Sequence, residues 1–233
     1  MPRPKPHAVI TGATRGIGRA IAENLGTTHR LTLLGRDEHL LQEIADKYED
    51  ARFIAADLRH DTDRVARELT NGPVDVLVHS AGVSTRGEVD TLHKEQWQDL
   101  FELNLFAVTE LTRLLIPSLR ETRGTVIFIN SGAGLFTSAG NGLYAASKHA
   151  LRAYADAVRI EERDKGIRVT SIHPGFVATD LVKEIADHEG VPYQPEKYLE
   201  PSTIAASVRY VVDASEEAMV ESISIRPRIP VVM

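Results

Sequence analysis

The segment TGATRGIG, residues Thr11–Gly18, joins a short apolar run to a helical pattern. The run Ala8–Thr11 is β-prone and Ile17–Leu25 is helical in character, so three glycines lie at a strand-to-helix junction. Glycine permits positive φ and leaves the backbone bare, and a helix N-terminus attracts anions. The segment therefore predicts a turn that binds the pyrophosphate of a dinucleotide. A purely structural turn is the alternative.

Strand-sized apolar runs alternate with helical patterns along the rest of the chain. Further strands are expected at Leu31–Leu34, Arg52–Ala55, Val74–His79, Thr125–Asn130, Ile167–Ile172 and Ser222–Arg226. Helices are expected after Asp37, which can cap one, at about 61–70, between the fourth and fifth strands, and at Tyr144–Lys165, before Gly166. Short apolar strands separated by helices are typical of a parallel sheet covered on both faces. We predict one doubly wound α/β domain over residues 1–233, with about seven strands.

The stretch 176–201 contains Pro192, Pro195 and Pro201 and reads as irregular. Long loops in compact domains are commonly functional, so this one is a candidate lid or substrate loop. A surface insertion is the alternative.

Composition narrows the possible functions. The 233 residues include 27 Lys and Arg, 33 Asp and Glu, and no cysteine, which gives a net charge of −6. An acidic balance argues against nucleic acid or a membrane as partner, and the absence of cysteine removes disulfides and thiolate metal sites. The histidines lack metal-ligand spacing, so no metal is expected. No signal peptide or spanning segment is visible, which predicts a cytoplasmic protein.

The choice of dinucleotide depends on the end of the second strand, about 20 residues after the glycine turn. A carboxylate there would select NAD, but the chain has Gly35 followed by Arg36, with Arg15 in the turn itself. Two guanidinium groups suit a 2′-phosphate, and Asp37 is better explained as a helix cap. The sequence favours NADP(H) over NAD(H).

Four polar residues form a candidate catalytic set. Tyr144 and Lys148 share one face of a helix, and a nearby ammonium moves the pKa of a phenol toward neutrality. Ser131 follows a predicted strand, where its hydroxyl could hold a substrate carbonyl oxygen. Asn104 is a polar residue on an apolar helical face. Each has an alternative explanation without catalysis. Tyr144 and Lys148 would be an ordinary pair on a helix, Ser131 a turn residue, and Asn104 a hydrogen-bonded core amide or a helix irregularity.

Over residues 8–180 the chain resembles the short-chain dehydrogenase/reductase family, in its compact single-domain branch. The matching segments are Thr11–Gly18 (TGxxxGxG), Asp57-Leu58, His79–Gly82 (usually NNAG), the four residues Asn104, Ser131, Tyr144 and Lys148, and Pro174–Thr179 (PGxVxT). Two segments depart from the pattern. His79-Ser80 replaces two asparagines, and 222–233 lacks the glycine-rich ending of many members.

The resemblance implies a Rossmann-type fold and an NADP(H)-dependent oxidoreductase that interconverts ketones or aldehydes and alcohols. Tyr144 would donate a proton to the carbonyl oxygen and Ser131 would hold that oxygen. Lys148 would lower the Tyr144 pKa and bind the nicotinamide ribose. Asn104 would fix a helix irregularity and a water. The implied cofactor-binding residues are Gly12, Thr14, Arg15, Gly16, Ile17, Gly18, Arg36, Asp57, Leu58, Ser80, Ala81, Gly82, Asn104, Tyr144, Lys148, Pro174, Gly175, Val177 and Thr179.

Two other functions remain open. A non-catalytic dinucleotide sensor would share the fold, but sensors tend to lose the tyrosine or lysine. An epimerase or dehydratase acting on nucleotide sugars shares that pair but usually needs a further domain, for which residues 180–233 are too few. A largely apolar pocket is expected from 133–136, Phe176 and about 181–199, with 84–86 nearby, for medium-sized ketones. Relatives form dimers or tetramers through helices that correspond to Lys94–Leu119 and Tyr144–Lys165.

Overall fold

Seven parallel strands form one sheet in the order β3-β2-β1-β4-β5-β6-β7. The computed structural model describes residues 5–69 and 72–229. The strands are β1 (His7–Thr11), β2 (Arg30–Gly35), β3 (Ala51–Ala55), β4 (Val76–His79), β5 (Thr125–Ile129), β6 (Arg168–Pro174) and β7 (Ser222–Ile225). The order reverses between β1 and β4, and ligands of such sheets bind where it reverses, at the carboxyl ends of the strands. The predicted doubly wound α/β fold is confirmed.

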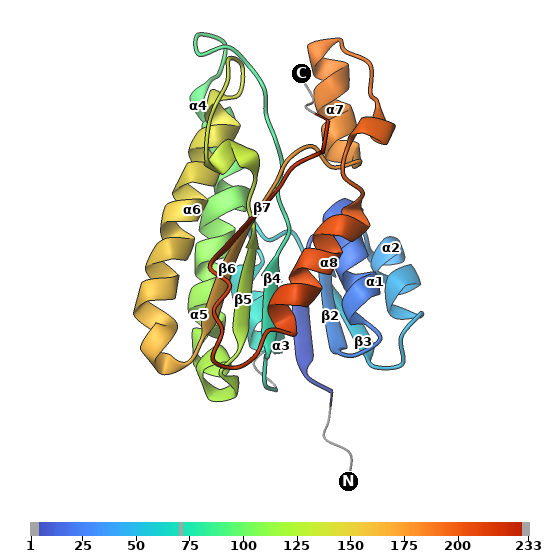
Figure 1. Ribbon diagram of the computed structural model, residues 1–233, viewed down its shortest axis with the longest axis vertical. Helices are drawn as coiled ribbons and strands as arrows, with labels where there is room; N and C mark the ends of the chain where they lie inside the picture. The colour runs from blue at the N-terminus through green and yellow to red at the C-terminus, as the bar shows by residue number, and fades with distance from the viewer. Residues whose placement is uncertain (1–4, 70–71, 230–233) are drawn as a thin grey trace.

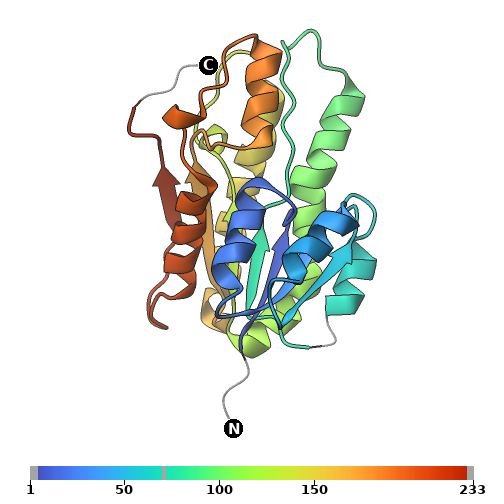
Figure 2. The same ribbon diagram turned by 90° about the vertical axis from the view of Figure 1, so that its right-hand side faces the viewer.

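Helices cover both faces of the sheet (Figures 1 and 2). They are α1 (Gly16–Leu25), α2 (Glu38–Ala45), α3 (Thr62–Leu69), α4 (Lys94–Phe101), α5 (Ala107–Thr122), α6 (Gly142–Glu162), α7 (Asp180–Glu189) and α8 (Pro201–Val212). The core on one face includes side chains of α1, α2 and α8, and the core on the other includes α3, α5 and α6. As predicted, Asp37 caps α2 by accepting from the backbone N–H of Leu40, and Gly166 ends the turn after α6 with φ 88°.

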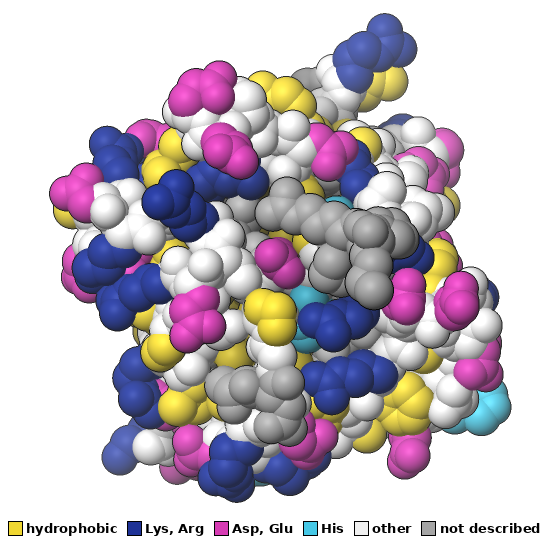
Figure 3. All heavy atoms as spheres, turned by 90° about the horizontal axis from the view of Figure 1, so that it is seen from below, with side chains coloured by type: hydrophobic (Ala, Val, Ile, Leu, Met, Phe, Trp, Pro, Cys, Tyr) yellow, Lys and Arg dark blue, Asp and Glu magenta, His cyan; other side chains and the backbone are white. Residues whose placement is uncertain are grey.

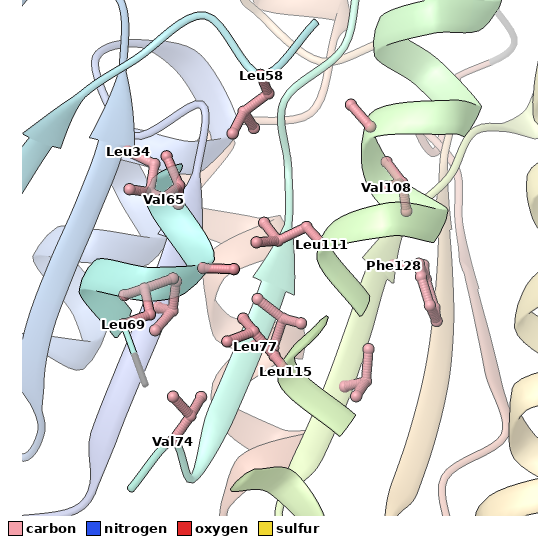
Figure 4. Packing of buried hydrophobic residues seen from close by; sticks show 14 of the residues in the cluster. Leu34, Leu58, Val65, Leu69, Val74, Leu77, Val108, Leu111, Leu115 and Phe128 are labelled. Atoms are coloured by element: carbon pink, nitrogen blue, oxygen red, sulfur yellow. The ribbon is translucent and has the colours of Figure 1, made fainter. Parts of the chain in front are cut away.

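The alternation of side chains along β4 divides the core between the two faces. Leu77 belongs to the cluster that includes Leu111 and Leu115 of α5, and the three lie close together in Figure 4. Its neighbours Val76 and Val78 belong to the opposite cluster. Each large aliphatic side chain buried in this way contributes about 1.5–3 kcal/mol to stability. The rigid layers hold the carboxyl ends of the strands in fixed positions.

The prediction of an irregular segment at 176–201 was wrong, because it contains α7. Thr179 caps the helix by accepting from the N–H of Val182, and Gly190 ends it with φ 65°. The segments just before and after α7 pair with each other. The N–H of Ala178 donates to the carbonyl oxygen of Leu199, and the N–H of Leu199 donates to the carbonyl oxygen of Phe176. This paired neck places α7 above the carboxyl edge of the sheet, at the top right of Figure 1.

The opposite end of the molecule has a mixed surface. Seen from below in Figure 3, basic and acidic side chains are interspersed there. None of the described helices is both long enough and apolar enough to cross a membrane. Residue 70, at the end of the helix expected at about 61–70, and residues 230–233 of the C-terminal segment lie outside the described residues.

Candidate active site

A first cavity follows the carboxyl ends of the strands from β3 to β4. It contains the glycine turn, the residue after β2, and the segments that follow β3 and β4. The predicted cofactor-binding residues that line it are Gly12, Thr14, Arg15, Gly16, Ile17, Gly18, Arg36, Asp57, Leu58, Ser80, Ala81, Gly82 and Thr179. The structure therefore brings together most of a set that is scattered over the sequence.

The glycine turn is shaped as a bare backbone cradle. Gly12 has φ 67°, and a Cβ there would lie 2.8 Å from the Cα of Ala81. A Cβ at Gly18 would overlap the carbonyl oxygen of Gly12. Helix α1 begins at Gly16 without a side-chain cap, so its first N–H groups and partial positive charge face the cavity. A phosphate group fits this cradle chemically.

The arginines at the far end of the cavity differ from the prediction in one respect. Arg36 lines the cavity and makes no ion pair with any described residue, as expected. Arg15, however, lies 3.6 Å from Asp180 and 3.8 Å from Glu184 on α7. Both expected guanidinium groups therefore line the cavity, but Arg15 is shared with two carboxylates of α7, a helix that was not predicted from the sequence. Sequence reasoning also missed Arg59, which lines the cavity.

A second cavity adjoins the first and lies beneath α7. The two share Ile17, Thr179 and Leu181 as lining residues. Of the predicted residues, the second cavity is lined by Ser131, Tyr144, Pro174, Gly175, Val177 and Thr179. Asn104 and Lys148 are buried, being 1% and 4% exposed. The first cavity is thus suited to a ligand that extends from the glycine turn. The second cavity adjoins it and contains the phenol of Tyr144 and the hydroxyl of Ser131.

Tyr144 and Ser131 meet in the second cavity. Ser131 accepts a hydrogen bond from the backbone N–H of Ala133 at 3.1 Å, and its side chain lines the same cavity as the Tyr144 phenol. Burial raises the pKa of Tyr144, while the Ser131 side chain and the positive charge of Arg86 oppose that rise. The positive charge of Arg86, which the sequence did not point to, thus acts on this phenol, whose ring centre also lies 5.8 Å from the Nζ of Lys148. The Nδ1 of His173 lies 3.2 Å from the Ser131 carbonyl oxygen and steadies the turn.

Lys148 lies one turn after Tyr144 on α6. Its Nζ donates to the carbonyl oxygen of Ile129 at 3.2 Å, and burial lowers its pKa to about 8. A Cβ at Gly82 would lie 3.7 Å from this Nζ and 3.3 Å from the Oδ1 of Asn104. The bare backbone of Gly82 therefore separates the first cavity from the two buried polar groups behind it.

Asn104 lies in a π-helical segment, Glu102–Phe106, between α4 and α5. Its amide accepts from the N–H of Val83 and donates to the Val83 carbonyl, both at 2.9 Å, and it donates to Ser147 at 3.2 Å. The sequence left two interpretations of Asn104 open, a hydrogen-bonded core amide and a helix irregularity, and the structure shows both. The asparagine ties the irregular helix to the loop that follows β4.

His79, which stands where the family pattern has asparagine, has a structural role. Its Nε2 lies 2.9 Å from the Thr112 hydroxyl, and its ring stacks on Phe128. Complete burial lowers its pKa to about 3, so the imidazole is neutral. The next two backbone N–H groups, of Ser80 and Ala81, both donate to the Thr11 hydroxyl at 3.0 Å. The substitution therefore leaves the end of β4 fully bonded.

Two arginines make the second cavity less apolar than predicted. Arg86, in the loop after β4, was expected only near the pocket, and Arg226, just after β7, was missed. The Nη1 of Arg226 donates to the carbonyl oxygen of His173 at 2.6 Å, and its guanidinium lies 5.5 Å from the centre of the Phe136 ring. The signal for Arg226 was its place at the carboxyl end of the strand predicted at Ser222–Arg226, close to the position that Ser131 has relative to its own strand. Within the described residues, no group of three or more His, Asp or Glu side chains could hold a metal ion.

Comparison with known proteins gives a consistent result. A family model described as short chain dehydrogenase matches residues 6–190. An uncharacterised oxidoreductase of Staphylococcus epidermidis is 31% identical over 227 residues, covering 94% of this chain and 96% of the relative. An alcohol dehydrogenase from Thermococcus sibiricus, solved with 5-hydroxy-NADP, is 27% identical with a TM-score of 0.88, covering 98% of this chain and 99% of that chain. The actinorhodin polyketide ketoreductase with NADPH is 26% identical with a TM-score of 0.88, covering 96% of each chain.

Proposed function

Since the chain belongs to the short-chain dehydrogenase family, and is thus an oxidoreductase with the fold of NAD(P)-binding enzymes, we propose that it is an NADP(H)-dependent carbonyl reductase or alcohol dehydrogenase. One observation carries the proposal: Tyr144 and Ser131 line the same chamber, and that chamber adjoins the cavity formed around the glycine turn. The proposed unit is the single domain of residues 1–233, with α7 and its neck as the cover of the substrate chamber.

The proposed chemistry divides the work between the cofactor and the side chains. The nicotinamide, when bound, supplies or accepts the hydride. In the reductive direction, Tyr144 donates its proton to the carbonyl oxygen while the Ser131 hydroxyl bonds to that oxygen and stabilises its developing charge. Lys148 carries its charge 5.8 Å from the centre of the Tyr144 ring, and its proposed roles are to bind the ribose of the cofactor and, with Asn104, to assist proton replacement.

The preference for NADP(H) is proposed from the arginines of the first cavity. Arg36 lines the cavity with a guanidinium that is free of ion pairs among the described residues, so it can bind a 2′-phosphate bidentately. Asp37, the nearest carboxylate in sequence, is engaged in capping α2. Two structural neighbours were solved with NADP-type cofactors, one with 5-hydroxy-NADP and one with NADPH, which supports the same preference.

A steady-state assay tests the activity. We expect the purified protein to oxidise NADPH in the presence of ketones, and Tyr144→Phe to lose about a hundredfold or more of the rate, because a positioned acid contributes that much. Fluorescence titration with NADPH should show unchanged cofactor affinity. The matched control is Tyr210→Phe, on the exposed face of α8, which should behave as wild type. A Tyr144→Phe variant with wild-type rates would refute the assignment, and tight NADPH binding without turnover of any carbonyl would favour a sensor.

We also propose a homodimer or homotetramer. Helices α4 to α6 expose large apolar side chains, with Ile160 76% and Phe106 51% exposed. Exposed apolar groups of this size on helices are commonly covered in an assembly. Light scattering on wild type and on Ile160→Lys tests this, since we expect the charge to shift the mass toward the monomer.

A further inference from the structure

The charged residues that line the second cavity are both cationic. Its lining among the described residues includes Arg86 and Arg226 but no Asp, Glu, Lys or His. The remaining lining is apolar or neutral and includes Phe136 and Phe176. Arg86 is largely removed from solvent, whereas Arg226 is exposed at the edge of the chamber. A chamber built only for neutral ketones has no need of either guanidinium group, and the one at Arg86 loses hydration by its burial.

Arg86 is nearly buried and incompletely neutralised. Its side chain is 11% exposed, and its one ion-pair partner among the described residues is Glu189, 3.7 Å from the Nε. That Nε is shielded from solvent and has no hydrogen-bond partner within the described part of the chain. A guanidinium has five donors, so Arg86 retains most of its capacity to bind an anion. Glu189 itself is one-third exposed at the end of α7, where it can turn to solvent.

Arg226 faces the same chamber from the other side and is held in position. Its guanidinium lies over the ring of Phe136, and one nitrogen is anchored on the carbonyl oxygen of His173. A Cβ at Gly132 would lie 3.1 Å from the Nη2, so the arginine passes across bare backbone beside Ser131. Stacking and anchoring reduce the entropy lost when such a side chain binds a ligand.

Resting on the proposed function, we propose that the second cavity selects carbonyl substrates that carry a carboxylate, which Arg86 binds with support from Arg226. A planar guanidinium matches a carboxylate with two parallel hydrogen bonds. Arg86 and Tyr144 line the same cavity, so a carboxylate bound by Arg86 lies within the same chamber as the reacting carbonyl. The carboxylate takes no part in the redox step. It orients the substrate and displaces Glu189 from Arg86.

Substrates matched in shape test this selection. The first comparison is kcat/KM for para-acetylbenzoate against its methyl ester and para-methylacetophenone, with NADPH as the reductant. Hydrogen bonds to a charged group correspond to about tenfold to a hundredfold, so we expect the carboxylate to be preferred by at least about tenfold. Equal or higher efficiency with the neutral ketones would overturn the proposal while leaving the proposed activity intact.

Variants locate the preference. Arg86→Gln should remove most of it and Arg226→Gln part of it, and the ratio between acid and ester is used because any effect of Arg86 on Tyr144 changes both rates alike. Glu189→Gln should keep or increase the preference, because it removes the competing carboxylate. Lys47→Gln, which removes a surface charge outside both cavities, should leave the ratio unchanged. If Glu189→Gln lost the preference for the carboxylate as Arg86→Gln does, the Arg86–Glu189 ion pair would serve only to hold α7 in place. The proposal would then be wrong.

Calorimetry separates the two possible failures. Titration of para-acetylbenzoate into the protein with NADP⁺ should show binding that Arg86→Gln weakens by about tenfold or more. If no carbonyl compound is reduced, the proposed activity fails, and this titration still decides whether the chamber binds a carboxylate. Absence of binding to wild type would overturn the anion site. Far-ultraviolet circular dichroism confirms that the variants are folded.

Discussion

The Nζ of Lys148 lies 5.8 Å from the centre of the Tyr144 ring and donates a hydrogen bond to the carbonyl oxygen of Ile129. The ammonium is thus tied to the end of β5 and turned toward the phenol one helical turn earlier. Burial lowers its pKa to about 8, so the group is charged at neutral pH and loses its proton just above it. This buried cation has a measurable consequence for stability.

We expect wild type to gain stability relative to Lys148→Met as the pH rises from 8 to 10. The unfolded chain keeps the proton up to the ordinary value of 10.5, whereas the folded chain releases it from about 8. Stability therefore rises with pH across this window, by about 2–3 kcal/mol. Urea unfolding of both proteins at pH 7.5 and pH 10 measures the difference, in which the other titrating groups cancel. Parallel changes in the two proteins would show that Lys148 titrates normally.

Gly12→Ala tests whether the glycine turn needs bare backbone. Its Cβ would lie 2.8 Å from the Cα of Ala81, in a residue with φ 67°, so the turn must shift. We expect NADPH affinity to fall by about tenfold or more, because the backbone N–H groups that face the phosphate move with it. Gly142→Ala is the control, since a Cβ there meets nothing within 4 Å. Equal affinity in the two variants, measured by fluorescence titration, would contradict the cradle.

Local patterns predicted the parts of the fold that depend on neighbouring residues. The strands, the Asp37 cap and the shared face of Tyr144 and Lys148 follow from spacing along one element, and the structure contains them. Helix α7 was missed because it is short and followed closely by prolines, although Thr179 and Gly190 at its ends and the helical spacing of its apolar residues were signals for it.

Contacts between distant segments were not visible in the sequence. Arg226 reaches Phe136 only because β7 pairs with β6, which brings residue 226 beside the turn after β5. The pairing of Arg15 with Asp180 and Glu184 depends in the same way on where the neck at 176–201 places α7. Spacing along the chain carries no information on such packing. The charges that face each cavity therefore could not be predicted from the sequence.

His79 is expected to make the protein sensitive to mild acid. Its pKa in the folded chain is about 3 against an ordinary 6.5, so the stability it contributes is complete above 6.5 and is lost as the pH falls toward 3. Between pH 7 and pH 5 the loss is about 2 kcal/mol. His79→Asn removes the titrating group, so its urea midpoint should fall less over this interval. Identical pH dependence in both proteins would mean that the imidazole accepts a proton without unfolding.

Arg36→Asp should reverse the choice of cofactor. Arg36 lines the first cavity without an ion pair among the described residues, whereas Arg15 is shared with two carboxylates of α7. Removing the guanidinium should lower kcat/KM for NADPH by about tenfold to a hundredfold, and the new carboxylate should improve NADH by accepting from the ribose hydroxyls.

Arg19→Gln is the matched control for Arg36, because it removes a positive charge from the outer face of α1, where Arg19 pairs with Glu23 and Glu43. It should leave the ratio of the two efficiencies unchanged. Asp180→Asn and Glu184→Gln extend the test to Arg15, since each removes one of its two ion-pair partners and should strengthen the preference for NADPH, with the largest effect in the double variant. If wild type used NADH as efficiently as NADPH, the selective role of Arg36 would be refuted. If the two α7 variants left the ratio of the two efficiencies unchanged, Arg15 would have no part in the selection, and the role of Arg36 would stand.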